Sequence, residues 1–117
     1  MPEKILVVDD DSHIRRLIRI HLSAAGYEVS DVATGEEALA LATNGAFSAV
    51  LVDLILPHFG GFRLCQKLKQ NVVPPPRVVI ITGDDSQQTR DTAREYGADG
   101  FLAKPFAREG LLAAVAG

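Results

Sequence analysis

Residues 5–10 read Ile-Leu-Val-Val-Asp-Asp, so four consecutive apolar residues run directly into two carboxylates. Two later stretches have the same form: residues 49–52 (AVLV) precede Asp53, and residues 78–81 (VVII) precede Thr82. Continuous apolar runs rich in β-branched residues are typical of strands buried on both faces, and such strands form parallel sheets. The pattern therefore predicts at least three neighbouring parallel strands in the interior of the protein.

A fourth and weaker run, residues 101–103, precedes Lys104 and completes the set of buried strands. Ligands of open parallel sheets bind beyond the carboxyl ends of the strands. We therefore expect one edge of the sheet to gather the polar groups that follow these runs. They are Asp9, Asp10, Asp53, Thr82 and Lys104.

Between the apolar runs, apolar residues recur with the period of a helix. The expected helices cover residues 12–25, 34–44, a stretch from about 61, 86–96 and a stretch from about 107. Residues 28–33 instead alternate polar and apolar side chains, which is typical of an edge strand. This order predicts an α/β fold, a three-layer doubly wound sandwich around a five-stranded parallel sheet. The strand order 2-1-3-4-5 places the alternating second strand at an edge.

Composition bounds the size and class of the protein. A chain of 117 residues is expected to form one domain, covering residues 1–117, and 47% apolar residues with a net charge of −3 predict a globular protein. No basic block is present, which argues against direct nucleic-acid binding. No apolar stretch approaches about 18 residues, so we expect no membrane segment, and no signal peptide is visible. The single cysteine, Cys65, fits a cytoplasmic protein.

The grouped side chains indicate a chemistry. Three neighbouring carboxylates cannot all stay ionised at low cost unless a cation joins them. A small set of hard oxygen ligands suits Mg²⁺, which keeps several waters and leaves room for a phosphate oxygen. Lys104 adds a compact positive charge and Thr82 a hydroxyl, and both suit a phosphoryl group. The combination predicts phosphoryl transfer onto an aspartate.

Four segments, in this order and spacing, resemble a receiver domain of a two-component response regulator, which has a flavodoxin-like fold. They are residues 7–10 (VVDD), 53–62 (DLILPHFGGF), 80–83 (IITG) and 104–106 (KPF). Each motif is weak alone, but the four together are specific and span nearly the whole chain. The resemblance implies that Asp53 is the phosphoacceptor. It implies Mg²⁺ ligation by the Asp10 and Asp53 carboxylates and the Ile55 backbone carbonyl, with Asp9 in the acidic pocket acting through water.

The resemblance also assigns the moving parts. It implies that Thr82 is a switch hydroxyl that turns toward the phosphoryl group and that Lys104 pairs with that group. Phe101 occupies the switch aromatic position, where tyrosine is often found. It further implies a cis peptide bond between Lys104 and Pro105. Asp84 is expected to flank the site, as is Ile55, and to influence the lifetime of the phosphorylated state.

The implied function is a signalling switch and not an enzyme. A sensor histidine kinase or a histidine phosphotransfer protein would supply the phosphoryl group, and the domain would catalyse its own phosphorylation and slow dephosphorylation. Only Ala93 and Tyr96 are apolar in the expected helix at Ser86–Tyr96, whereas the final stretch, residues 110–117, is apolar nearly all round. These two helices and the fifth strand are expected to carry output, as a homodimer interface or by docking an output domain.

Two alternative functions accompany this interpretation. A pseudo-receiver would act as a protein-interaction module without being phosphorylated, and a small-molecule phosphatase would need a substrate pocket.

Asp11 begins the first helix and is expected to cap it rather than bind metal. A basic stripe is expected on the exposed side of the same helix, either solvated or facing a histidine-bearing partner. It consists of Arg15, Arg16 and Arg19.

Overall fold

The structure is a computed structural model and describes residues 2–117. The strands are β1 (Lys4–Val8), β2 (Glu28–Val32), β3 (Ala49–Asp53), β4 (Arg77–Thr82) and β5 (Gly100–Ala103). The helices are α1 (Ser12–Ala24), α2 (Gly35–Asn44), α3 (Gly61–Asn71), α4 (Gln87–Glu95) and α5 (Arg108–Ala116). Within the described residues, none of the helices has the length and apolar content that a membrane span requires.

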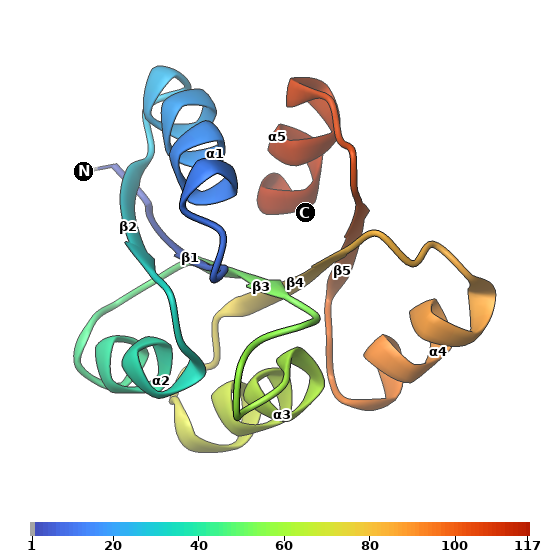
Figure 1. Cartoon of the computed structure of the whole chain (residues 1–117). Coiled ribbons are helices and arrows are strands. Elements are labelled where there is room, and N and C mark those ends of the chain that lie inside the picture. Colours follow the sequence, from blue (N-terminus) through green and yellow to red (C-terminus); the bar gives the residue numbers. More distant parts are fainter. Residues whose placement is uncertain (1) are drawn as a thin grey trace.

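The five strands form one parallel sheet in the order β2-β1-β3-β4-β5, which confirms the predicted order. Helices α1 and α5 cover one face, and α2, α3 and α4 cover the other, so the molecule has three layers (Figure 1). The alternating segment at residues 28–32 is the edge strand β2, as expected. The predicted α/β doubly wound sandwich is therefore confirmed.

Helices cover both faces of the sheet, and because successive side chains of a strand point to opposite sides, each strand contributes to two cores. On one side, Ile5, Val7 and Leu51 pack with α1 and α5 residues such as Ile18 and Leu111. On the other, alternate strand residues pack with α2, α3 and α4. This second core includes Leu6, Val8, Val50, Val52, Ala38, Leu64, Cys65 and Ala93. Uninterrupted apolar runs such as residues 5–8 are therefore needed to fill two cores at once.

Two local features place the carboxyl ends of the strands. The Asp11 side chain caps α1 by accepting a hydrogen bond from the His13 amide at 2.9 Å, as expected for this residue. Helix α3 begins at Gly61, directly behind the end of β3. A Cβ atom on Gly61 would lie 2.5 Å from the Asp53 carbonyl oxygen, so only glycine lets the helix start this close to the strand.

Candidate functional site

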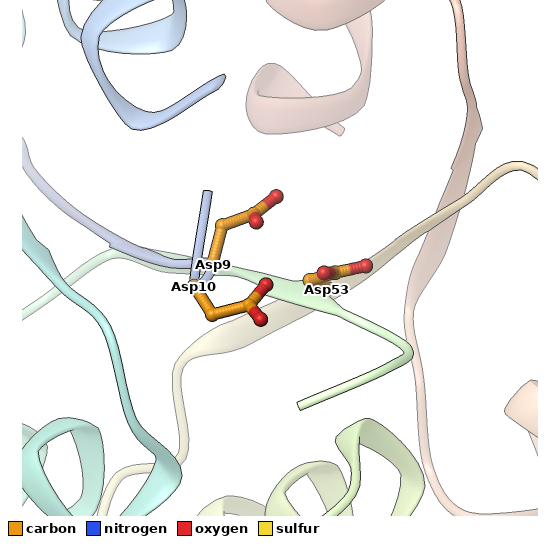
Figure 2. Close-up of side chains that lie close together, drawn as sticks. All are labelled: Asp9, Asp10 and Asp53. Carbon is orange, nitrogen blue, oxygen red and sulfur yellow. The ribbon is translucent and has the colours of Figure 1, made fainter. Parts of the chain in front are cut away.

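Three carboxylates gather beyond the ends of two neighbouring strands (Figure 2). Asp9 and Asp10 follow β1, and Asp53 is the last residue of β3. One carboxylate oxygen from each residue lies within 4.8 Å of the others, so the three could hold a metal ion. Asp9 is fully buried, Asp53 is nearly so and Asp10 is exposed. The cluster is thus closed to solvent at Asp9 and open to solvent at Asp10.

Lys104 supplies the positive charge of the cluster from the end of β5. Its Nζ donates a hydrogen bond to Asp9 Oδ2 at 3.2 Å and lies 3.6 Å from Asp53 Oδ1. Burial lowers the pKa of the Lys104 ammonium, but the carboxylates of Asp53 and Asp9 outweigh that effect and leave the pKa raised. The peptide bond between Lys104 and Pro105 is cis, which confirms that prediction.

Asp53 carries the clearest electrostatic signature of the site. Burial raises its pKa to about 6, helped by the charge of Asp9 and opposed by Lys104. By count, one ammonium does not offset three carboxylates, so the fully ionised cluster carries excess negative charge. The donor set is all oxygen with an exposed member, which fits a hard divalent cation such as Mg²⁺.

Thr82 ends β4 beside this cluster and is buried. Its hydroxyl oxygen accepts a hydrogen bond from the Asp84 amide at 3.0 Å. Asp84 is in turn bonded to the beginning of α4: its carboxylate accepts from the Thr89 hydroxyl at 2.7 Å and from the Ser86 amide at 3.0 Å. These bonds lower the pKa of the Asp84 carboxyl. The Thr82 hydroxyl is thus linked through Asp84 to Ser86, the N-cap of α4.

Phe101 and Ile55, two further residues of the expected site, differ in their burial. The Phe101 ring is half-buried and packs against the core on the α2, α3 and α4 side. The Arg90 guanidinium lies over this ring, 4.5 Å from its centroid. Ile55 is 77% exposed, so its side chain contributes little to the core.

The family model described as the response regulator receiver domain matches residues 5–116 of this chain. The chain belongs to the response regulator receiver domain family. It shares 41% identity over 113 residues with the response regulator MprA of Mycobacterium sp. strain KMS, covering 97% of this chain and 49% of that protein. The chain thus spans about half the length of the curated relatives it matches.

Solved receivers have the same fold. The chemotaxis response regulator CheY4 of Vibrio cholerae superimposes with a TM-score of 0.92 at 32% identity, over 99% of this chain and 98% of that one. A response regulator from Burkholderia pseudomallei has a TM-score of 0.88 at 34% identity, over 97% of this chain and 66% of that one. That crystal structure contains a phosphorylated aspartic acid, a calcium ion and citrate.

The expected basic stripe on α1 of this receiver is only partly correct. Arg16 is exposed, but the Arg15 side chain is only 19% exposed, and its Nε bonds to Asp31 Oδ2 at 2.9 Å. Arg19 pairs with the other oxygen of Asp31 at 2.8 Å. Arg15 and Arg19 are four residues apart and so share a helix face. That spacing, together with a carboxylate on the neighbouring strand, was the sequence signal that could have indicated their pairing with Asp31.

Proposed function

We propose that this receiver accepts a phosphoryl group on Asp53 from a phosphohistidine, using Mg²⁺, and responds by changing conformation. The observation that supports it is the position of Asp53, where a carboxylate cluster meets the Lys104 ammonium. The donor would be a sensor histidine kinase or a histidine phosphotransfer protein. The phosphorylated aspartic acid and calcium ion of the Burkholderia pseudomallei relative support the same chemistry by analogy.

The proposed metal ligands are the carboxylates of Asp10 and Asp53 and the backbone carbonyl of Ile55, with Asp9 acting through water. When bound, Mg²⁺ would supply positive charge to the phosphoryl oxygens. The excess negative charge of the cluster, three carboxylates against one ammonium, supports binding of such a cation. Its exposed member, Asp10, leaves the metal side of the site open to water and phosphate.

In the proposed transfer, a carboxylate oxygen of Asp53 attacks phosphorus and forms a P–O bond. The P–N bond to the donor histidine breaks, and its electron pair returns to the imidazole nitrogen. Lys104 stabilises the negative charge of the phosphoryl oxygens, since its Nζ already lies 3.6 Å from Asp53 Oδ1. With a pKa of about 6, Asp53 is mostly ionised at neutral pH and can act as the nucleophile.

Phosphorylation would add about −1.5 to −2 charge next to Thr82 and Lys104. We propose that the Thr82 hydroxyl then turns toward the phosphoryl group and gives up the Asp84 amide. The surface formed by α4, β5 and α5 would carry the output, as a homodimer interface or by docking an output domain. Phe101 lies on β5 at this surface. The domain would lose its phosphoryl group slowly, as a switch requires.

The intact mass of the protein tests the assignment directly. Acetyl phosphate with Mg²⁺ should add one phosphate to the wild type, and EDTA should prevent the gain. The Asp53→Asn variant should stay unmodified, whereas Asp85→Asn, which removes an exposed carboxylate outside the cluster, should behave as wild type. An Asp53→Asn protein that gains phosphate at the wild-type rate contradicts the assignment. A wild type that gains none would favour the pseudo-receiver alternative.

A further inference from the structure

The backbone of Asp9 is held from two sides. Its amide donates to the carbonyl oxygen of Val32, at the end of β2, at 3.2 Å. Its carbonyl oxygen accepts from Arg15 Nη1 of α1 at 2.7 Å, among the shortest hydrogen bonds of the site. The carbonyl belongs to the planar peptide unit that joins Asp9 to Asp10, so fixing this oxygen also fixes the Asp10 nitrogen and Cα.

Arg15 is itself held in place. Its Nε bonds to Asp31 Oδ2 at 2.9 Å, and Asp31 is bound from its other oxygen by Arg19 at 2.8 Å. Arg19 Nη1 also donates to the carbonyl oxygen of Val29 at 2.9 Å. The Asp31 side chain is 28% exposed, so this network is partly protected from water. The planar guanidinium of Arg15 thus bridges the β2 carboxylate and the Asp9 carbonyl in one fixed fork.

We propose that Arg15 is a positioning residue for the metal end of the site. By holding the peptide between Asp9 and Asp10, it sets where the Asp10 carboxylate stands relative to Asp53. This inference rests on the proposed function, because it assigns Arg15 a part in binding the divalent cation. Arg15 touches neither the metal nor the phosphoryl group and acts only through the backbone.

Charge and position predict opposite signs for the loss of Arg15. If the arginine acted only as a positive charge near the carboxylates, its removal would tighten binding of a divalent cation. If it positions Asp10, its removal weakens binding, because the cation then has to order the ligand itself. Mutating a group that hydrogen-bonds to a metal ligand and orients it typically weakens metal affinity by about 10–100-fold. Arg15 acts one step further back, so we expect about tenfold weaker Mg²⁺ binding, at the lower end of that range.

Calorimetric titration with MgCl₂ of the unphosphorylated protein is the primary test. Arg15→Met keeps most of the side-chain length and removes every donor, and Arg15→Lys keeps the charge but loses the fork. A matched control, Arg16→Met, removes one positive charge at an exposed neighbour outside this network. We expect about tenfold weaker binding in Arg15→Met, a smaller loss in Arg15→Lys and less than about twofold change in Arg16→Met.

Phosphorylation by acetyl phosphate gives a second readout. The Mg²⁺ concentration for half-maximal rate should rise in Arg15→Met by the same factor as the dissociation constant. The rate at saturating Mg²⁺ should return close to the wild-type value, because Asp53 and Lys104 are unchanged. The amide NMR spectrum shows whether the variant is folded. In a folded variant, a role of Arg15 confined to stability would not shift the Mg²⁺ concentration for half-maximal rate.

The outcomes separate the inference from the function it rests on. Arg15→Met and Arg15→Lys proteins that bind Mg²⁺ as tightly as wild type, or more tightly, overturn the positioning role. If Arg15→Met does not fold, Asp31→Ala takes its place, because it keeps Arg15 and removes the side-chain acceptor that anchors it. Unchanged binding there and in Arg15→Lys has the same meaning. A wild type that neither binds Mg²⁺ nor gains phosphate instead contradicts the proposed function.

Discussion

Helices α1 and α4 begin at the same edge of the sheet, yet they are attached to it in different ways. Helix α1 starts just after Asp10 and buries Ile18 and Leu22 completely in the core. Helix α4 starts after Asp84, and Ala93 is its only buried residue among those described. One helix is therefore fixed by large apolar side chains, and the other lies on the surface with little apolar contact.

Their polar contacts differ in the same direction. In α1, Arg15 bonds to Asp31 of β2 and to the backbone of Asp9, and Arg19 bonds to β2. The side chains of α4 bond mostly within the helix or to the loop before it, as Gln87 does to Asp91 and Arg90 does to Asp85. Elements with little burial and exposed bonds open at low free-energy cost. We infer that the metal side of the site is rigid and the Thr82 side is free to rearrange.

The largest expected difference between the two helices is in stability. Leu22→Ala in α1 should lower the free energy of unfolding by about 3 kcal/mol, because it leaves a cavity in a filled core. Arg90→Ala in α4 should cost less than about 1 kcal/mol, because its ion pair with Asp85 is exposed. Denaturant unfolding of both variants measures this. Similar losses in the two helices would contradict the comparison.

The second prediction concerns the pH dependence of stability at the metal side of the site, where Asp53 lies. Because folding raises the pKa of Asp53 from 3.8 to about 6, its contribution to stability is full below 3.8 and is lost as the pH rises through about 6. Asp53→Asn should therefore match wild type near pH 4 and exceed it at pH 8. One pKa unit corresponds to about 1.4 kcal/mol, so we expect a gain of about 1–3 kcal/mol.

Thermal unfolding in EDTA across this pH range is the measurement. Saturating Mg²⁺ should stabilise wild type more than Asp53→Asn and thereby reduce the difference between them. A constant difference between the two proteins from pH 4 to 8 would mean that Asp53 does not titrate as its surroundings indicate.

The third prediction concerns the movable side. Beryllofluoride, a mimic of the phosphoryl group, should change amide exchange in α4, β5 and α5, while α1 amides near Ile18 stay as protected as before. Exchange measured by mass spectrometry, with and without the mimic, locates the response, and light scattering of the same samples reports any change of association state. If the changes were confined to α1, the assignment of α1 to the rigid side and of α4 to the movable side would be wrong.

The smallest expected effect is on phosphoryl lifetime. The exposed, apolar Ile55 offers no hydrogen bond to an attacking water, so Ile55→Asn should shorten the half-life of phosphorylated Asp53 a few-fold while phosphorylation itself remains intact. The Asp84 carboxylate is occupied by Thr89 and Ser86, so Asp84→Asn should change the half-life less. Decay of the added mass measures both; an unchanged half-life in Ile55→Asn would contradict the shielding role.

The sequence predicted the strands and the gathering of the carboxylates because both follow from local rules. A continuous apolar run such as residues 5–8 has to be buried on both faces, and parallel strands bring their carboxyl ends to one edge. Arg15 was misplaced because its environment depends on where Asp31 stands, and that is set by the register of β2 against β1. The contact between Arg90 and Phe101 likewise depends on tertiary packing, which no local pattern encodes.

The junction at Gly61 has a consequence for protein engineering. The Leu54 amide bonds to the Ile81 carbonyl at 2.9 Å, and the Gly61 amide bonds to the Leu54 carbonyl at 2.9 Å, so the two ends of the intervening loop are tied together. A loop with joined ends can change length at small entropic cost without moving its flanks. An insertion at its tip, the exposed residues 57 and 58, should thus leave Asp53 in position while loosening the segment that carries the Ile55 carbonyl, a proposed metal ligand.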